Sequence, residues 1–136
     1  MVDLGGFVAG ASAATVVTLM ISRRSSAGHR QRDPQRAFSE AQRRAIFARA
    51  GERCEHTSLF GLRCTSRPTH ADHVQPWSRG GATTLANAQA LCARHNLQKS
   101  NHAPSAWYLH RLEHRRRSYF PPGEPVQIAW RIGGRR

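Results

Sequence analysis

Residues 70–100 read HADHVQPWSRGGATTLANAQALCARHNLQKS and contain nearly all the side chains of the chain that suit catalysis or metal binding. An acid and a histidine stand side by side, a glycine pair follows, and an asparagine precedes a Cys-x-x-His-Asn sequence. In chain order the residues of this series are Asp72, His73, Gly80, Gly81, Asn87, Cys92, His95, Asn96 and Lys99. Any catalytic function of the chain is therefore expected to lie in this stretch.

The pattern of the same stretch predicts two short strands followed by a helix. Residues 72–77 alternate weakly between polar and apolar side chains, and Pro76 and the glycine pair end the run, which is typical of a strand, a turn and a second strand. A helix is predicted from Leu91 to about Ser100, with its start near Asn87. The positive end of that helix dipole would favour an anion close by.

The charge of the chain favours a polyanionic partner. Its 136 residues include 21 Lys and Arg against 8 Asp and Glu, for a net charge of +13, and every one of these basic residues except Lys99 is an arginine. Residues 38–136 alone carry 16 basic and six acidic residues, so +10 of this charge belongs to that part of the chain. Nucleic acid and anionic lipid both suit such a surface, because charge alone does not distinguish them.

The three cysteines indicate a metal site. Cys54, Cys64 and Cys92 cannot all pair within one monomer, which excludes a complete disulfide framework. A single domain of this size buries a small share of its surface and often needs a metal or a covalent cross-link. His95, three residues after Cys92, would complete a tetrahedral Cys3His zinc set. Nine residues separate Cys54 from Cys64, and His56 between them is an alternative fourth ligand.

The amino-terminal segment is a candidate membrane anchor. Residues 4–21 form an 18-residue run without a charge, which approaches the length needed to cross a bilayer core of about 30 Å. Asp3 precedes the run and Arg23 and Arg24 follow it, so the positive-inside rule would place the remainder of the chain in the cytoplasm. A dispensable extension and a cleavable signal are the alternatives. Without an anchor, the chain is expected to be soluble and cytoplasmic.

The remaining segments predict a linker, two helices and a strand. Residues 23–37 are rich in Arg, Ser and Gln and predict a disordered basic linker. A capping-box pattern over residues 39–42 predicts a helix of about three turns that ends at a glycine cap. A second helix is predicted over residues 105–118. Alternating apolar residues over 126–132 predict a half-buried strand.

The order of acid, histidine, glycine turn, asparagine and Cys-x-x-His-Asn resembles the HNH endonuclease family, whose members have a ββα-metal nuclease fold. The resemblance spans about Arg53 to Asn101. It implies an α+β fold, with a small HNH nuclease domain over residues 38–136 that includes flanking helices. A hydrophobic helix over residues 1–22 and a basic linker over 23–37 would precede this domain.

The resemblance implies metal-dependent hydrolysis of phosphodiester bonds. His73 would be the general base, and its ordinary pKa of about 6.5 leaves it mostly neutral at pH 7. Asp72 and Asn96 would hold one Mg²⁺, for which Mn²⁺ would substitute. The family often has histidine in place of Asn96, so weak metal binding is expected without substrate. Asn87 would brace the loop or orient the histidine. A regular strand points neighbours to opposite faces, so a twist or bulge is expected between Asp72 and His73.

The expected partner is double-stranded DNA, bound through its phosphates by a basic face, and the sequence leaves the oligomeric state open. The predicted phosphate-contacting residues are Arg94, Lys99, Arg111, Arg115, Arg116 and Arg117. Two other functions suit the same sequence. One is a noncatalytic, zinc-stapled nucleic-acid-binding module, and the other is a membrane-surface binder that acts with the amino-terminal segment.

Overall fold

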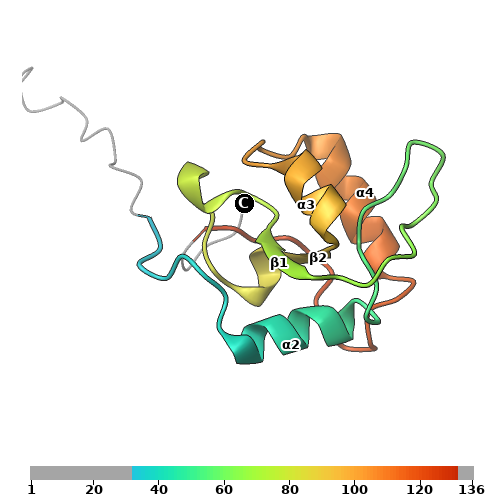
Figure 1. Cartoon of the computed structure of the whole chain (residues 1–136), viewed down its shortest axis with the longest axis horizontal. Helices are drawn as coiled ribbons and strands as arrows, with labels where there is room; N and C mark the ends of the chain where they lie inside the picture. Colours follow the sequence, from blue (N-terminus) through green and yellow to red (C-terminus); the bar gives the residue numbers. More distant parts are fainter. Residues whose placement is uncertain (1–31, 132–136) are drawn as a thin grey trace, which may run out of the picture.

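A two-stranded antiparallel sheet lies at the centre of the structure, with helix α2 on one side and helices α3 and α4 on the other (Figure 1). The computed structural model describes residues 32–131, and these form a small α+β domain. The elements are α2 Glu40–Arg49, β1 His70–His73, the 3-10 turns η1 Trp77–Arg79 and η2 Leu85–Asn87, β2 Ala88–Leu91, α3 Ala93–Lys99 and α4 Ala106–Arg116.

The two strands and α3 form the strand, strand, helix unit that the sequence predicts. β1 pairs antiparallel with β2 in a register that places His70 opposite Leu91 and His73 opposite Ala88. Cys92 is the N-cap of α3, so this helix begins directly after the second strand. The predicted α+β class and the predicted order of strand, strand and helix in this unit are therefore confirmed.

The predicted bounds of these elements are wrong in two places. β1 ends at His73 instead of continuing to Trp77. The next two backbone N–H groups donate to Asn87, one to its backbone oxygen at 2.7 Å and one to its side-chain Oδ1 at 2.9 Å. Asn87 itself ends the 3-10 turn before β2 and does not lie near the start of α3. A long loop therefore separates the two strands.

Asn87 holds this loop closed. Its side chain is fully buried, and its Nδ2 donates to the backbone oxygens of Gln75 and Ala82 at 3.0 and 2.8 Å. Gly81 lies against the same contact, where a Cβ would be 1.9 Å from the Gln75 oxygen and 2.8 Å from Asn87 Nδ2. Only glycine fits there, because no side chain can approach backbone so closely. Asn87 thus braces the loop, which is one of the two roles predicted for it.

The two flanking helices begin as the sequence predicts. Ser39 Oγ accepts from the Gln42 backbone N–H at 3.2 Å, and the Ser39 N–H donates to Gln42 Oε1 at 2.8 Å, which completes the capping box of α2. Gly51 follows that helix with a φ of 62°, a conformation that favours glycine. Ser105 caps α4 by accepting from the Tyr108 backbone N–H at 3.1 Å. Both amino-terminal ends are therefore fixed by local hydrogen bonds.

The strand predicted over residues 126–132 is wrong for the part that the structure describes. Ile128 is buried, as the alternating pattern requires, but its N–H donates to Glu113 Oε1 in α4 at 2.8 Å. The Trp130 backbone oxygen accepts from the Ala82 N–H in the interstrand loop at 2.8 Å. The segment up to residue 131 therefore packs on a helix and a loop, and no strand lies beside it among the described residues.

Most of the amino-terminal predictions concern residues outside the described part of the chain. These are the hydrophobic segment over residues 1–22 and residues 23–31 of the predicted linker. Within residues 32–131, every helix is too short or too polar to cross a membrane. The anchor and its alternatives therefore stay predictions.

The described end of the predicted linker, residues 32–37, contacts the domain. Asp33 Oδ2 accepts from the Thr83 backbone N–H at 2.8 Å. The Asp33 backbone oxygen accepts from the indole Nε1 of Trp77 at 2.8 Å. Both partners belong to the loop between the strands, so residues 32–37 cover that loop.

Two apolar clusters pack around the sheet. The cluster between α2 and the strands consists of Phe38, Ile46, Ala50, Ala88 and Ala90. The cluster between α4 and the carboxyl-terminal segment consists of Val74, Leu109, Leu112 and Ile128. The first cluster thus includes two residues of β2, whereas the second meets the sheet only at Val74, directly after β1, and only β2 is buried along its whole length.

A buried ion pair joins α4 to the segment that follows Cys54. The Glu55 and Arg116 side chains are 0% exposed, and Arg116 Nε lies 2.9 Å from Glu55 Oε1. The same carboxylate accepts from the Ala90 backbone N–H at 2.7 Å and from the Tyr119 hydroxyl at 2.9 Å. The prediction that Arg116 contacts DNA phosphates is wrong, because its guanidinium is enclosed in the core.

Replacing Arg116 with methionine should lower the free energy of unfolding by about 3–5 kcal/mol, because the Glu55 carboxylate is left buried without its counter-charge. Urea denaturation in zinc-containing buffer, followed by circular dichroism, measures this change. Arg117→Met is the matched control, since Arg117 is the exposed neighbour and its loss should change the free energy by no more than about 0.5 kcal/mol. Equal unfolding midpoints for the two variants would show that the pair does not hold the fold.

Candidate functional site

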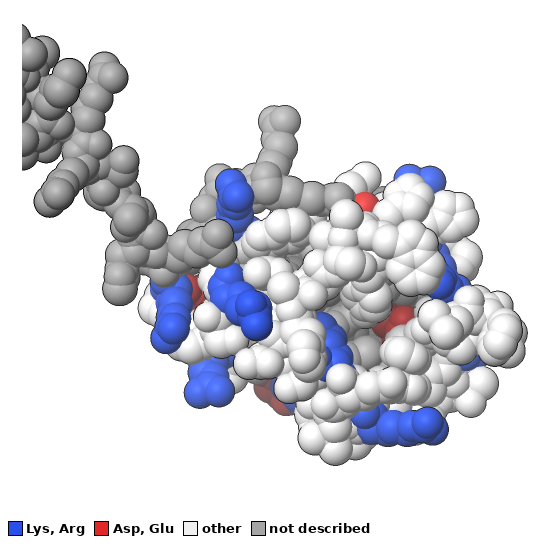
Figure 2. Space-filling model, turned by 90° about the horizontal axis from the view of Figure 1, so that it is seen from above, with Lys and Arg blue, Asp and Glu red and all other residues white. Residues whose placement is uncertain are grey.

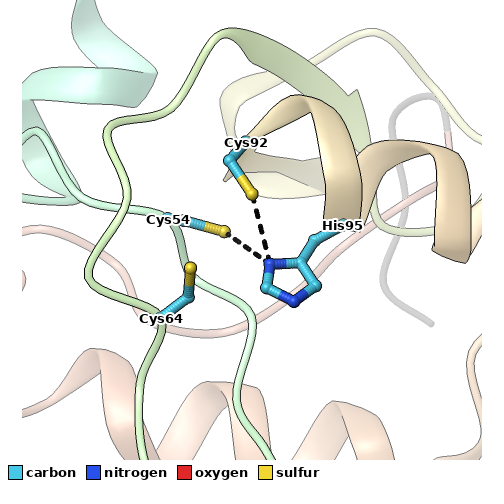
Figure 3. A group of neighbouring side chains, drawn as sticks. All are labelled: Cys54, Cys64, Cys92 and His95. Carbon is cyan, nitrogen blue, oxygen red and sulfur yellow. Dashed lines mark hydrogen bonds between the residues drawn. The ribbon is translucent and has the colours of Figure 1, made fainter.

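Four side chains converge on one point beside the sheet (Figure 3). The ligand atoms of Cys54, Cys64, Cys92 and His95 all lie within 4.8 Å of one another. His95 Nδ1 is 3.2 Å from Cys92 Sγ and 3.6 Å from Cys54 Sγ. A tetrahedral zinc ion, with bonds of about 2.3 Å to sulfur and 2.0–2.1 Å to nitrogen, separates its ligand atoms by about 3.5–3.8 Å. This cluster is therefore able to hold one metal ion, as the sequence predicts.

Backbone hydrogen bonds place the four ligands. The Cys54 N–H donates to the Ser66 oxygen and the Cys64 N–H to the His56 oxygen, both at 2.9 Å, so the two cysteines face each other across a loop. Arg63 closes this loop by donating from Nε to the Cys54 oxygen at 2.9 Å. The other two ligands come from the N-cap and the first turn of α3. The cluster thus joins the loop to the amino-terminal end of α3.

His56, the alternative fourth ligand, lies outside this set of four. Its ring stacks on His95, with 3.7 Å between centroids and an interplanar angle of 12°. Burial lowers the pKa of His95, which favours the neutral imidazole that a metal binds. Burial raises the pKa of the Cys54 thiol to about 11, and a bound divalent cation would remove that proton. His56 therefore supports the ring of His95 without joining the cluster.

Asp72 and His73 line a cleft of about 350 Å³ on the opposite part of the ββα unit. The strand register is continuous through both residues, so the expected bulge between them is absent from the described pairing. His73 is the last residue of β1, and both side chains face the cleft because it lies at the end of the strand. The other lining residues are Arg36, Pro76, Trp77, Ser78, Ser100 and Asn101.

Hydrogen bonds fix the protonation of His73. Its Nε2 lies 2.9 Å from Thr83 Oγ1, and the Thr83 hydroxyl donates its single proton to the Gln35 backbone oxygen. Thr83 Oγ1 can then only accept, so Nε2 of His73 carries the proton and Nδ1 carries the free lone pair. Burial lowers the pKa of His73 below its ordinary value, which favours this neutral form at pH 7. The ring is held ready to accept a proton at Nδ1.

The sequence gives no sign of the residues that hold His73 in this state. Thr83 lies in the loop and Gln35 in the predicted linker, and neither stands in a recognisable motif. Gln42 of the α2 capping box also donates from Nε2 to the Thr83 backbone oxygen at 3.3 Å. Phe38 packs its ring on that of His73 at 4.5 Å between centroids. Only the tertiary structure brings these segments together.

The Asp72 carboxylate already has a cationic partner. Lys99 Nζ lies 2.8 Å from Asp72 Oδ2, and Gln89 Nε2 donates to the same oxygen at 3.5 Å. Asn96, the second predicted magnesium ligand, stands three residues before Lys99 on α3. Residues at this spacing share one helix face, so Asn96 lies on the side of α3 that carries Lys99 to Asp72.

The predicted phosphate-contacting residues do not form one face. Arg94 and Arg117 are exposed, whereas Arg111 and Arg115 hold the loop near Gly61. Arg111 donates to the Ser58 oxygen at 3.2 Å and Arg115 to the Gly61 oxygen at 2.8 Å. With Arg116 buried and Lys99 paired to a carboxylate, only two of the six are free to meet DNA without rearrangement.

Other arginines lie at the cleft instead. Arg32 and Arg36 place their guanidinium carbons 5.3 and 5.5 Å from the ring centroid of Trp77, and Arg36 and Trp77 line the cleft. Figure 2 shows several Lys and Arg side chains toward the amino-terminal end of the described residues. Besides Lys99, which pairs with Asp72, the basic residue that lines the cleft is therefore Arg36, from the segment that was predicted to be a linker.

The sequence comparisons agree with this geometry. Residues 52–102 match the profile of a family described as HNH endonuclease. Over these residues the chain is similar to an HNH endonuclease domain. The matched segment contains the whole ββα unit and all four residues of the Cys3His cluster, which is consistent with a zinc-binding HNH domain. Comparison with curated proteins and with solved structures gives no match.

The four-residue cluster makes a prediction that separates the two candidate histidines. His95→Ala should remove the bound zinc, whereas His56→Ala should keep one zinc per chain, because only the ring of His95 points a nitrogen at the cysteines. Elemental analysis of the two proteins, purified without chelators, measures the difference. Cys92→Ser is the positive control for zinc loss. Retention of zinc by His95→Ala together with its loss from His56→Ala would reverse the assignment.

Proposed function

We propose that the HNH domain is a DNA endonuclease in which His73 activates the attacking water. The observation that carries this proposal is the hydrogen-bond chain from His73 through Thr83 to Gln35, which leaves Nδ1 as the unprotonated nitrogen of a histidine that lines the cleft beside Asp72. Hydrolysis of a phosphodiester needs such a base within reach of a water molecule. A buried imidazole that is neutral at pH 7 suits this role.

The residues beside His73 suit a divalent cation. The Asp72 carboxylate binds the Lys99 ammonium at 2.8 Å, so a cation is accommodated at this position. Asp72 and Asn96 offer carboxylate and amide oxygens, which are ligands that Mg²⁺ and Mn²⁺ accept. When bound there, the ion would neutralise charge on the phosphate and on the departing 3′ oxygen. We assign this ion a catalytic role and the ion of the Cys3His cluster a structural role as zinc.

The other steps belong to the residues of the chain. His73 Nδ1 takes a proton from water as the oxygen attacks phosphorus, and Thr83 keeps the ring in the required tautomer. Arg36, at the rim of the cleft, attracts the phosphate strand, and the +13 charge of the chain favours DNA over an uncharged substrate. Asn87 takes no part in proton transfer, because it is buried within the loop that it braces.

The wider biological setting is also a proposal. A double-stranded DNA substrate agrees with the basic charge, which suits sequence-independent phosphate contacts. A cytoplasmic nuclease domain tethered by residues 4–21 is the arrangement that the hydrophobic segment favours, and a soluble cytoplasmic protein is the alternative. Both arrangements concern residues 4–21, which lie outside the described residues, because these begin at residue 32.

A noncatalytic, zinc-stapled DNA-binding module is the second candidate. The observation that favours it is the ion pair between Asp72 and Lys99, because a carboxylate neutralised by an ammonium lacks the free charge that a metal ion requires. In this alternative the Cys3His cluster and the basic residues would bind DNA, and the cleft would have no role in hydrolysis.

His73→Ala should lower the cleavage rate by about 10²–10⁴-fold, the usual contribution of a general base, while zinc content and DNA affinity stay near those of the wild type. The matched control is His70→Ala, which removes a histidine from the other end of the same strand, outside the residues that line the cleft. Nicking of supercoiled plasmid with Mg²⁺ measures both. Cleavage by His73→Ala within a few-fold of the wild type would favour the noncatalytic module.

A further inference from the structure

Lys99 is the only lysine of the chain, and it lies at the candidate active site. In a sequence that otherwise uses arginine for its fixed positive charges, a lysine offers different chemistry. Its ammonium is a compact charge on a flexible stem, whereas a guanidinium forms rigid, paired hydrogen bonds to a carboxylate. A cation that has to leave a carboxylate and return to it is better supplied by lysine.

The ion pair between Lys99 and Asp72 is close but incomplete. The two side chains are 13% and 24% exposed, so water screens the pair only in part. Lys99 Nζ is buried and has no aligned hydrogen-bond partner among the described residues, although Asp72 Oδ2 is 2.8 Å away. An ammonium has three N–H donors, and donors that stay unsatisfied in a buried place are costly. Lys99 is therefore held by charge and not by a set of directed bonds.

Lys99 also lines a second cavity, of about 450 Å³, on the side of α3 nearer to the Cys3His cluster. Its lining contains no acidic residue. Besides Lys99, the polar residues that line this cavity are His56, His95, Gln98, His102, Ser105 and Tyr108. A small rotation of the lysine stem would thus carry the ammonium from a carboxylate into a space that is free of competing negative charge.

We propose that Lys99 is an exchangeable counter-ion, and that the cavity beside it receives a phosphate group of the substrate strand. In the free protein the ammonium neutralises Asp72. When DNA binds, the ammonium turns to a phosphate oxygen in the second cavity, and the released Asp72 carboxylate takes the divalent cation. This inference rests on the proposed function and adds to it a phosphate subsite and an order of events.

The exchange couples the metal to the substrate. Among the described residues, Asp72 is the one acid that lines the candidate catalytic cleft, so the ammonium and a divalent ion compete for one carboxylate. A phosphate that draws Lys99 away favours metal binding, and by thermodynamic linkage the metal favours DNA binding by the same factor. Asn96 is uncharged, so Asp72 is the one charged residue of the two predicted metal ligands, and this makes the competition for it sharper.

The test is Mn²⁺ binding to the zinc-loaded protein, read from the electron paramagnetic resonance of free Mn²⁺. Without DNA, affinity should rank Lys99→Met above wild type and wild type above Lys99→Arg, with Lys99→Met at least about fivefold tighter than wild type. Arg94→Met is the matched control, since it removes one exposed positive charge from the same helix and should leave the affinity unchanged. Asp72→Asn gives the background. Equal affinities for the three residue-99 proteins would overturn the exchange.

A second arm tests the phosphate subsite in the His73→Ala background, in which cleavage should be about 10²–10⁴-fold slower. A short DNA duplex should raise the Mn²⁺ affinity of this protein but not that of His73→Ala/Lys99→Met, after subtraction of binding to DNA alone. An equal gain in both would overturn the subsite. If the wild type does not cleave DNA but the Mn²⁺ affinities rank as predicted, the proposed hydrolysis alone is overturned. If the wild type cleaves DNA but the three residue-99 proteins bind Mn²⁺ equally, the proposed exchange alone is overturned. If Lys99→Met fails to fold, the comparison of wild type with Lys99→Arg still decides.

Discussion

The Glu55 carboxylate is the interaction on which the rest of the structure depends. It follows Cys54 directly, accepts from the backbone of Ala90 in β2, and pairs with Arg116 at the end of α4. One buried charge thus fixes the position of a metal ligand, of the second strand and of a flanking helix. Since β2 sets the register of β1, the Glu55 carboxylate also fixes the end of β1, where His73 lies. A charge in this environment is stable only while its partners stay in place.

The capping and ligand patterns of the sequence predicted their features correctly, whereas the alternating pattern over residues 126–132 predicted a strand that the described residues do not form, and long-range contacts account for the errors. The α2 capping box depends on two residues three apart, and the Cys3His set on three cysteines and a histidine three residues after the last of them. Both patterns can be read from the sequence. Arg116 was misassigned to the surface because it is charged. Its position seven residues after Leu109 and four after Leu112 continues the apolar stripe of α4, and that spacing was the available sign of burial. Thr83 and Gln35 meet only through the fold.

The two candidate functions differ in how the cleft treats charge. As a binding module, the domain would gain from a neutral Asp72, because a carboxylate repels phosphate. As a nuclease, it needs that carboxylate free at the moment of reaction. The exchange that we propose for Lys99 would satisfy both requirements in turn, since the ion pair with Asp72 would neutralise the carboxylate before substrate binds and release it afterwards. The Cys3His cluster lies at the amino-terminal end of α3, away from the cleft, and would serve either function equally, so it does not decide between them.

The most direct test of the central claim, that the cleft of the HNH domain is a metal-dependent hydrolytic site, is cleavage of supercoiled plasmid by the wild-type, zinc-loaded protein with and without added Mg²⁺. The account predicts nicked and linear DNA only when Mg²⁺ is present, with zinc content unchanged in both samples. Intact plasmid in Mg²⁺, from protein that is folded, loaded with zinc and bound to the DNA, would contradict it. Equal cleavage without Mg²⁺ would also contradict the role given to Asp72.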